Sequence, residues 1–391
     1  MSVVRTFHPV GQGGFYTETF DDSKNKSMIV FDCGGNSSKS MRDYLDSFIS
    51  NNPTVTIEAV FISHLHDDHI NGLQHLLDRA NVKKIFLPQF NTNRLFDIFF
   101  YNAANGARTD DSNNLVLSLI NPTNTFGETQ IIQVEETNGD ISYREDANHM
   151  HQVSQTIASG TPLKLENEWI YIPFNPKSKT PNFDRIKDQS IKEILQGLYN
   201  NATNPHEQAE ALAKFVKLHG VKKCKELYKD MFGNIHNGQS MTLFSGLRKS
   251  EYHKIRCYPL HSPFNHFYRY LWRDYLYEFK NYNENCILTN FLYTGDYESG
   301  DSAKMKELSS FYTKMQVWET ICGVQIPHHG SRNNYADELY NKRCYAIASA
   351  GASNKYHHPN IDTLINIFHQ RCMPFVVTEA KNTIIMQEFN I

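Results

Sequence analysis

Short apolar runs separated by glycine-containing turns recur toward both ends of the chain. Runs of this length, rich in β-branched and aromatic residues, are typical of strands that are buried on both faces. Several are flanked by segments with helical spacing, which predicts a layered α/β domain. The runs are "MIVFDCGG", "IEAVFIS", "KKIFLP", "EWIYIPF", "SMTLFSG", "CILTNFLYTGD" and "CYAIASAG".

The pattern becomes helical in the middle of the chain. Apolar residues recur at intervals of three or four between Ile191 and Val216. This spacing predicts a helical insertion over about residues 176–233 within a single domain spanning 1–391. A second insertion, over about residues 258–285, is crowded with aromatic residues, and we expect "RTDDSNN", residues 108–114, to be a mobile loop.

Composition limits the class of protein. With 391 residues, of which 40% are hydrophobic, the chain is long enough for a large core. The formal net charge of -3 argues against a broadly polycationic surface, so any contact with nucleic acid must be local. The seven cysteines include no CxxC pair, which predicts buried, reduced thiols. Because the chain lacks a signal-peptide pattern and any apolar run of about 20 residues, we expect a cytoplasmic protein with no membrane partner.

The densest group of potential metal ligands is the stretch "HLHDDH". It follows the apolar run Glu58–Ser63 and precedes leucines spaced as the inner face of a helix, so it is predicted to lie on a strand-to-helix loop. The mouth of an α/β sheet is where such proteins bind ligands. His64 and His66, two apart on an extended segment, can point toward one metal ion, while Asp68 and His69 can point toward a second.

This stretch resembles the HxHxDH signature of the metallo-β-lactamase-fold hydrolases. The resemblance implies an αββα sandwich with two metal ions at one edge. Asp296, in "LYTGDYE", matches the aspartate that bridges the two ions in that family. Asp32, in "FDCGG", lies at the end of an early strand, where the family has an acidic residue that supports the site.

Several phrases narrow the resemblance to the C-terminal domain of the ComEC competence proteins, which is regarded as a metal-dependent nuclease. "VGQGGFY", "IPHHGSRNN" and "SAGASNKYHHPN" are similar to the VGQGD, VPHHGS and SVG-N-YGHP phrases of that domain, and "NGQSMTLFSG" is similar to its N-x-x-S strand. These phrases leave both insertions without a counterpart. The chain departs from the family at Gly14, where VGQGD has an aspartate, so any role of that carboxylate is lost.

The resemblance leaves the third metal-binding motif open. Asn175 lies where the family often has a histidine, and His261, in the aromatic insertion, is the alternative. In "PHHGS", adjacent residues of an extended chain point to opposite sides, so one histidine is expected to bind the second ion and the other to face substrate. We expect His329 to be the ligand and His328 its neighbour. His358 matches the family's G-H-P histidine and is expected to bind phosphate or protonate a leaving group.

The resulting prediction is a hydrolase that holds two divalent metal ions. Nitrogen and oxygen ligands without thiolates suit zinc and allow manganese. Two such ions lower the pKa of a shared water from 15.7 to about 7, which supplies a bridging hydroxide as nucleophile. The predicted ligands are His64, His66, Asp68, His69, Asp296 and His329. The predicted catalytic residues are Asp68, which would orient the hydroxide, His328 and His358.

The substrate is expected to be a phosphodiester, with DNA and RNA as candidates. The ComEC-like phrases favour this class, and Arg332 with the backbone amides near Gly330 could hold a phosphate. The alternative is another hydrolase of the same fold, such as a lactonase, a thioesterase or a phosphorylcholine-esterase-like enzyme. A non-catalytic binding module and an iron-based oxidoreductase are weaker alternatives, because the ligand set is intact and no flavodoxin-like partner domain is visible.

Overall fold

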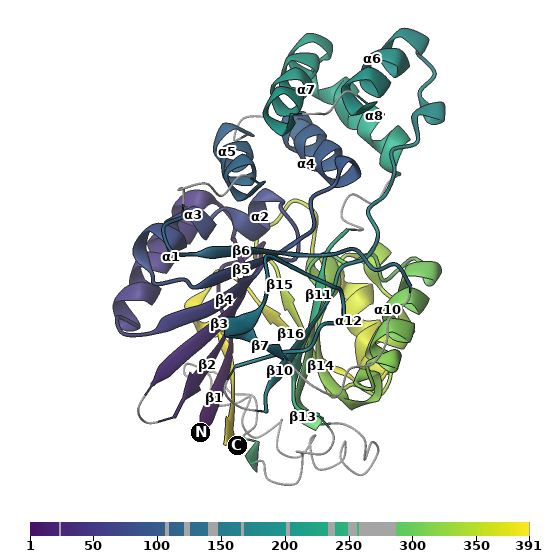
Figure 1. Ribbon diagram of the computed structural model, residues 1–391. Coiled ribbons are helices and arrows are strands. Elements are labelled where there is room, and N and C mark those ends of the chain that lie inside the picture. The colour runs from purple at the N-terminus through teal and green to yellow at the C-terminus, as the bar shows by residue number, and fades with distance from the viewer. Residues whose placement is uncertain are drawn as a thin grey trace.

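Two β-sheets face each other in the computed structural model, with helices on both outer sides (Figure 1). The aromatic insertion expected over residues 258–285 lies outside the described residues, and so does His261. The structure describes every residue except 23–24, 106–108, 121–125, 140–147, 166–167, 201–203, 234–238, 249–255, 258–286 and 391.

The first sheet contains nine strands and brings the two ends of the described chain together. Its strands β3 to β6 run parallel to one another. Their continuous apolar sequences fit this arrangement, because both faces of a parallel sheet are covered. In sheet order the strands are β12 (Arg256–Cys257), β17 (Ile385–Asn390), β1 (Ser2–Phe7), β2 (Phe15–Asp21), β3 (Lys26–Cys33), β4 (Thr56–Phe61), β5 (Lys84–Pro88), β6 (Gln130–Val134) and β8 (Thr156–Ile157).

In the described part of the chain, the second sheet contains eight strands. Strands β13 to β16 run parallel, whereas β10, β11 and β13 pair in antiparallel fashion. In sheet order the strands are β16 (Met373–Val377), β15 (Tyr345–Ser349), β14 (Ile321–Gln325), β13 (Ile287–Tyr293), β11 (Thr242–Gly246), β10 (Ile170–Phe174), β9 (Leu163–Lys164) and β7 (Asn148–His149).

Helices cover the outer face of each sheet. Helices α1 to α3 lie against the first sheet, and α10 and α12 lie against the second (Figure 1). The helices are α1 (Ser38–Asn51), α2 (Asp67–Ile70), α3 (Leu73–Arg79), α4 (Thr92–Asn105), α5 (Thr109–Ile120), α6 (Gln189–Asn200), α7 (Pro205–His219), α8 (Val221–Phe232), α10 (Ser302–Lys314), α11 (Asp337–Tyr340) and α12 (Ile361–His369). Short 3₁₀ helices are η1 (Met150–Gln152), η2 (Phe183–Arg185), η4 (Trp318–Thr320), η5 (Pro327–Gly330), η6 (Arg332–Asn334) and η7 (Lys381–Thr383).

Local sequence signals account for several helix ends. Asn204 caps α7 by accepting a hydrogen bond from the backbone amide of His206, and Pro205 occupies the first turn, where its missing N–H is not needed. The same helix ends at Gly220, whose φ of 82° is unfavourable for a residue with a side chain. Asp301 caps α10 in the same way as Asn204 caps α7.

Three layers of buried apolar side chains alternate with the two sheets. The middle layer fills the space between them, where Phe61 of β4 stacks on Tyr171 of β10 with ring centroids 5.7 Å apart. One outer layer joins the first sheet to α1, for example through Leu45, and the other joins the second sheet to α10 through Leu308. This is the αββα architecture, so the fold-class prediction is confirmed.

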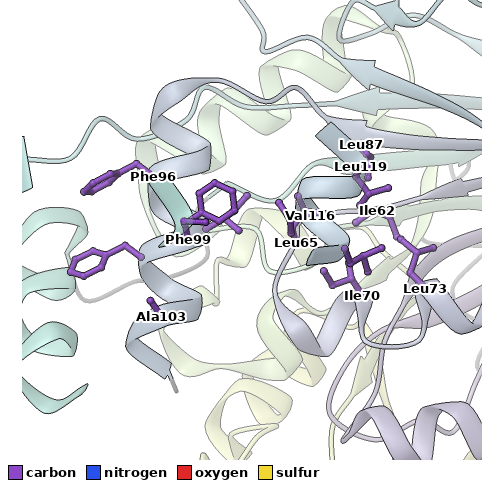
Figure 2. Packing of buried hydrophobic residues seen from close by; sticks show 14 of the residues in the cluster. Ile62, Leu65, Ile70, Leu73, Leu87, Phe96, Phe99, Ala103, Val116 and Leu119 are labelled. Carbon is purple, nitrogen blue, oxygen red and sulfur yellow. The ribbon is translucent and has the colours of Figure 1, made fainter. Parts of the chain in front are cut away.

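Helix α4 connects this sandwich to helices α6, α7 and α8. Phe96 of α4 packs against aromatic rings of the helical insertion, with centroids 5.5 Å from Tyr199 and 6.4 Å from Phe232. Figure 2 shows Phe96 on the side of α4 that faces away from Leu65 and Val116. The core of the helical region is therefore continuous with the core of the sandwich.

The prediction of a mobile loop over residues 108–114 was wrong from Thr109 onward, because α5 begins there; Arg108 lies outside the described residues. Val116 and Leu119, three apart, are fully buried against the first sheet and α4. Asn113 is also buried and accepts a hydrogen bond from Asn102 of α4 at 2.8 Å. This tertiary contact compensates for a polar sequence that by itself favours a loop.

Two further expectations concern cysteines and membranes. The five cysteines whose side chains are described, Cys33, Cys224, Cys322, Cys344 and Cys372, are free and buried, as predicted. Among the described helices, none is both long enough and apolar enough to cross a membrane.

Candidate metal centre

The loops at one edge of the two sheets carry the predicted site residues. In the first sheet, β4 is followed by the histidine-rich loop and then by α2. In the second sheet, β13 is followed by Asp296, and β14 by η5. The amide of His328 in η5 donates a hydrogen bond to the carbonyl of Gly295 at 3.1 Å, which ties these two loops together. The site therefore lies where the carboxyl ends of strands from both sheets meet.

Six predicted ligands form two clusters, each with one ligand atom per residue and all such atoms within 4.8 Å of one another. Asp296 faces both clusters: its Oδ2 is 3.7 Å from Nε2 of His64, and its Oδ1 is 3.3 Å from Nε2 of His69. This is the position that a bridging carboxylate requires. The first cluster consists of His64, His66 and Asp296, and the second of Asp68, His69 and His329.

The two clusters fit divalent cations. The Nε2 atoms of His64 and His69 are buried and form no hydrogen bond. A buried imidazole nitrogen without a partner is unfavourable, and a cation placed between it and the nearby carboxylates would remove the cost. Every atom offered is a nitrogen or an oxygen, a set that zinc and manganese both accept. The described residues therefore support divalent metal binding.

Asp32 holds one ligand of the second cluster, His69, in place by a hydrogen bond. It is fully buried, and Nδ1 of His69 donates a hydrogen bond to its Oδ2 at 2.8 Å, which directs Nε2 of His69 toward the cluster. The amide and the hydroxyl of Ser63 also donate to Asp32, at 2.7 Å and 2.9 Å. A Cβ on Gly14 would lie 3.0 Å from that of Asp32, so the carboxylate expected at position 14 has no room beside Asp32.

Two serines that sequence reasoning missed hold the first cluster. Nδ1 of His64 is 3.0 Å from Oγ of Ser63 and 3.1 Å from Oγ of Ser240, and the latter also accepts from the amide of Asp296 at 3.0 Å. Ser240 belongs to the "NGQSMTLFSG" phrase, so its position carried a signal. Tyr101 of α4 stacks on His66 with ring centroids 3.9 Å apart. Its position carried no signal in the sequence, because α4 reaches the site only by tertiary packing.

The charges within the site strongly shift one another's pKa. Burial by itself lowers the pKa of His69, but neighbouring carboxylates, led by Asp296, raise it well above its ordinary value. Burial by itself raises the pKa of Asp296, but three neighbouring histidines hold it well below its usual range. His64 differs from His69, because burial lowers its pKa well below the ordinary value. A cation entering the second cluster must therefore displace a proton, whereas His64 is already neutral.

The predicted backbone of the two adjacent histidines was wrong. His328 has a φ of 50° and His329 a φ of 55°, so both adopt the left-handed conformation instead of an extended one. His329 is buried, donates from Nδ1 to the carbonyl of Ser349 at 2.8 Å and presents Nε2 to Oδ2 of Asp68 at 3.2 Å. The ring of His328 lies 6.1 Å from that of His329 and 5.7 Å from that of His358.

His358 lies on the loop between β15 and α12. Its amide donates to Oδ1 of Asn354 at 2.9 Å. A Cβ on Gly330 would lie 2.4 Å from the Cβ of Pro359, so this loop packs directly against the turn that carries the two adjacent histidines. Burial, with a smaller contribution from His328, lowers the pKa of His358 to about 4, which makes the imidazole neutral at pH 7.

Asn175, one candidate for the third motif, is engaged outside both clusters. Its Oδ1 accepts a hydrogen bond from Nη2 of Arg94 at 2.9 Å, and its Nδ2 donates to the carbonyl of Val134 at 2.7 Å. The other candidate, His261, is not described. Arg94 was not expected at the site; it belongs to α4, and its Nη1 donates to the carbonyl of Gln239 at 2.8 Å.

Arg332, expected to hold a phosphate, lies on the surface beside the site. Its side chain is 74% exposed, and its Nη1 is 3.4 Å from Oδ2 of Asp362. An exposed pair of this kind is weak, so the guanidinium can exchange its carboxylate partner for an anionic ligand at little cost.

Fold and site together define the class: the chain is a metallo-β-lactamase-fold protein whose two histidine–aspartate clusters support a metal-dependent hydrolase. Within that class, a family model described as "Anti-Pycsar protein Apyc1" matches residues 14–171, a span that contains Asp32 and the whole histidine-rich loop. The match ends before Asp296 and His329. No curated protein matches the chain. The narrower resemblance to ComEC stays a prediction.

Among solved structures, the chain is similar to the B3 metallo-β-lactamase BLEG-1, with 19% identity over 22% of this chain and 37% of that one and a TM-score of 0.17. It is also similar to an archaeal metallo-β-lactamase superfamily protein from Sulfolobus tokodaii, with 15% identity, coverage of 44% and 54%, and a TM-score of 0.20. A third is rubredoxin oxygen:oxidoreductase from Desulfovibrio gigas, with 11% identity, coverage of 96% and 92%, and a TM-score of 0.23. The chain spans about a third of the first of these proteins and about half of the second.

Proposed function

We propose that the protein is a dinuclear metal phosphodiesterase. The observation that carries this proposal is the position of Asp296, whose two carboxylate oxygens face different clusters of nitrogen and oxygen ligands. Two divalent ions, zinc or manganese, held there would lower the pKa of a bound water to about 7 and so supply a nucleophile at neutral pH.

The ligands of the second cluster have two further roles, accepting a proton and keeping the ligand atoms in position. Asp68 lies at the mouth of the second cluster with a third of its side chain exposed, where it can accept a proton from the attacking water. His69 is held by Asp32, and His329 by the carbonyl of Ser349, so both present Nε2 inward in a fixed tautomer. These supports keep the ligand atoms in place before substrate arrives.

His328 and His358 supply the side of the site that faces substrate. Their rings are 5.7 Å apart, and a phosphoryl oxygen placed between them can accept from both. Because the pKa of His358 is lowered to about 4, this side chain is neutral at pH 7. It therefore binds phosphate as a hydrogen-bond donor more readily than it delivers a proton to a leaving group.

A small phosphodiester suits the surface better than a long polynucleotide. A net charge of -3 gives no overall excess of basic residues for a polyanion, and the exposed Arg332 follows directly after the histidine turn. The family described as anti-Pycsar Apyc1, the phosphodiester-directed ComEC-like phrases and this charge distribution all support a nucleotide phosphodiester. DNA and RNA remain the alternative substrates within this class.

The test is a substrate panel on the metal-loaded protein. It contains bis-p-nitrophenyl phosphate, a cyclic mononucleotide, single-stranded DNA, single-stranded RNA, a lactone and a thioester. We expect hydrolysis of the phosphodiesters, and its loss together with bound metal in His64→Ala. Turnover of the lactone or thioester with none of any phosphodiester would replace this proposal by the other hydrolase class.

A further inference from the structure

A small cavity lies beside the histidine pair of the first cluster. Its volume is about 20 Å³, which by this measure is enough for one water molecule. The cavity is lined by His64, His66, Arg94, Asp97 and Gln239, together with apolar side chains. It is therefore polar, and it touches the cluster for which the described residues supply no third histidine.

Two polar atoms of side chains that line this cavity have no hydrogen-bond partner. They are Nε of Arg94, which can only donate, and Oε1 of Gln239, which can only accept. Both side chains are more than nine-tenths buried, with exposures of 3% and 7%. A buried donor and a buried acceptor without partners are both unfavourable, so a group that satisfies the two is favoured.

The orientation of the Gln239 amide is fixed by its neighbours. Its Nε2 donates to Oδ2 of Asp97 at 2.8 Å, and the other oxygen of Asp97 accepts from the hydroxyl of Tyr228 in the helical insertion. Because the carboxylate can only accept, it holds the amide nitrogen on its own side and turns Oε1 away from it.

We propose that Arg94 and Gln239 hold one water molecule in this cavity, and that this water occupies the coordination position of the first metal that a third histidine fills in related sites. The water accepts from Nε of Arg94, donates to Oε1 of Gln239 and directs a lone pair toward the His64–His66 pair. It thus has the two to four polar partners that an ordered buried water needs. Asp97 and Tyr228 are positioning residues, because they act only through the amide of Gln239.

This inference rests on the metal centre proposed above. Its test measures metal affinity, so the result does not depend on which substrate the enzyme hydrolyses. Zinc binding is measured by competition with a chelator, and cobalt loading by visible absorption, which reports the coordination of each ion. We expect Gln239→Leu to weaken one of the two sites 10- to 100-fold, the usual effect of losing a partner of the ligand shell, and to leave the other unchanged.

A matched control exists in the same chain. Gln208, in α7, is also buried and also has an unpartnered Oε1, but it lies among the helices of the insertion, where its Nε2 donates to the carbonyl of Leu198. Gln208→Leu should leave both affinities unchanged. In the double variant Asp97→Asn, Gln239→Glu, the amide at position 97 donates to the carboxylate at position 239, and a carboxylate oxygen still faces the cavity. This variant should restore the affinity of the weakened metal site.

Two results would overturn the inference. One is wild-type affinity at both sites in Gln239→Leu. The other is loss of the first metal in His236→Ala while Gln239→Leu still binds both metals, because a protein nitrogen would then occupy the position. His236 lies outside the described part of the chain. If His64→Ala also keeps both metals, the metal centre itself is wrong; if His64→Ala loses one and Gln239→Leu does not, only the water site is wrong.

Discussion

Replacing Asp32 with asparagine tests whether the support beneath the second cluster is required for metal binding. Asparagine has almost the same shape and tolerates the φ of 56° at this position, so the backbone is not strained. The carboxylate of Asp32 accepts three hydrogen bonds, two from Ser63 and one from His69. An amide has one oxygen and one NH₂ group, so at least one of these donors must face another donor.

The magnitude follows from the hydrogen bond that is lost. If the NH₂ group faces His69, the imidazole must move its proton to Nε2, the atom that faces the cluster. A hydrogen bond to a charged group contributes about 1.5–3 kcal/mol, and losing a partner of a metal ligand typically reduces affinity 10- to 100-fold, which is about 1.4–2.7 kcal/mol. The two estimates agree, so we expect Asp32→Asn to weaken one metal site by 10- to 100-fold.

The assay is the same chelator competition, with circular dichroism to show that the variant is folded. Asp46→Asn is the matched control, because Oδ1 of Asp46 forms the same kind of carboxylate–imidazole contact with Nε2 of His75, at 2.8 Å, away from the metal centre. That variant should bind both ions normally. Two intact sites in folded Asp32→Asn would refute the assignment of Asp32 as the support of His69.

Three further predictions concern pH, substrate binding and packing. His8 is buried and its pKa is lowered to about 3, below the unfolded value of about 6.5, so its contribution to stability is present above pH 6.5 and lost as the pH falls toward 3. Between pH 7 and pH 5 the wild type should lose about 2 kcal/mol more than His8→Gln in urea unfolding, and parallel losses would contradict this. His358→Ala should keep both metals and slow a poor alkoxide leaving group and p-nitrophenolate by similar factors; a much larger deficit for the alkoxide would show that His358 donates a proton. Phe99→Ala, at a fully buried position on α4, should cost about 3–5 kcal/mol, whereas Phe368→Ala, 58% exposed on α12, should change stability by less than about 0.5 kcal/mol; equal effects would mean that the core assignment is wrong.

Part of the site could be predicted because its ligands are neighbours in sequence. His64, His66, Asp68 and His69 follow one strand directly, so the local geometry of a strand-to-helix loop is enough to bring them together. Asp296 and the histidine turn come from distant strands, and they were placed by the order of phrases similar to those of a known family, not by local geometry.

The residues that sequence reasoning missed reach the site from α4. Arg94, Asp97 and Tyr101 lie on one helix that presents no motif, and they face the site only because its aromatic residues pack against the helical insertion. The position of such a helix depends on the sum of many apolar contacts over distant residues. A periodic pattern gives the buried face of the helix but not the element against which it packs.

The sequence by itself determined the αββα class, the loop that carries four ligands and the reduced state of the described thiols. Only the tertiary structure decided that residues 109–120 form a helix, because burial of Val116 and Leu119 against distant elements outweighs a polar local sequence. It also decided that His328 and His329 adopt a left-handed turn. That conformation is unfavourable for a histidine in isolation and is stabilised here by the hydrogen bond from His328 to Gly295, a residue on another strand's loop that no local pattern connects to it.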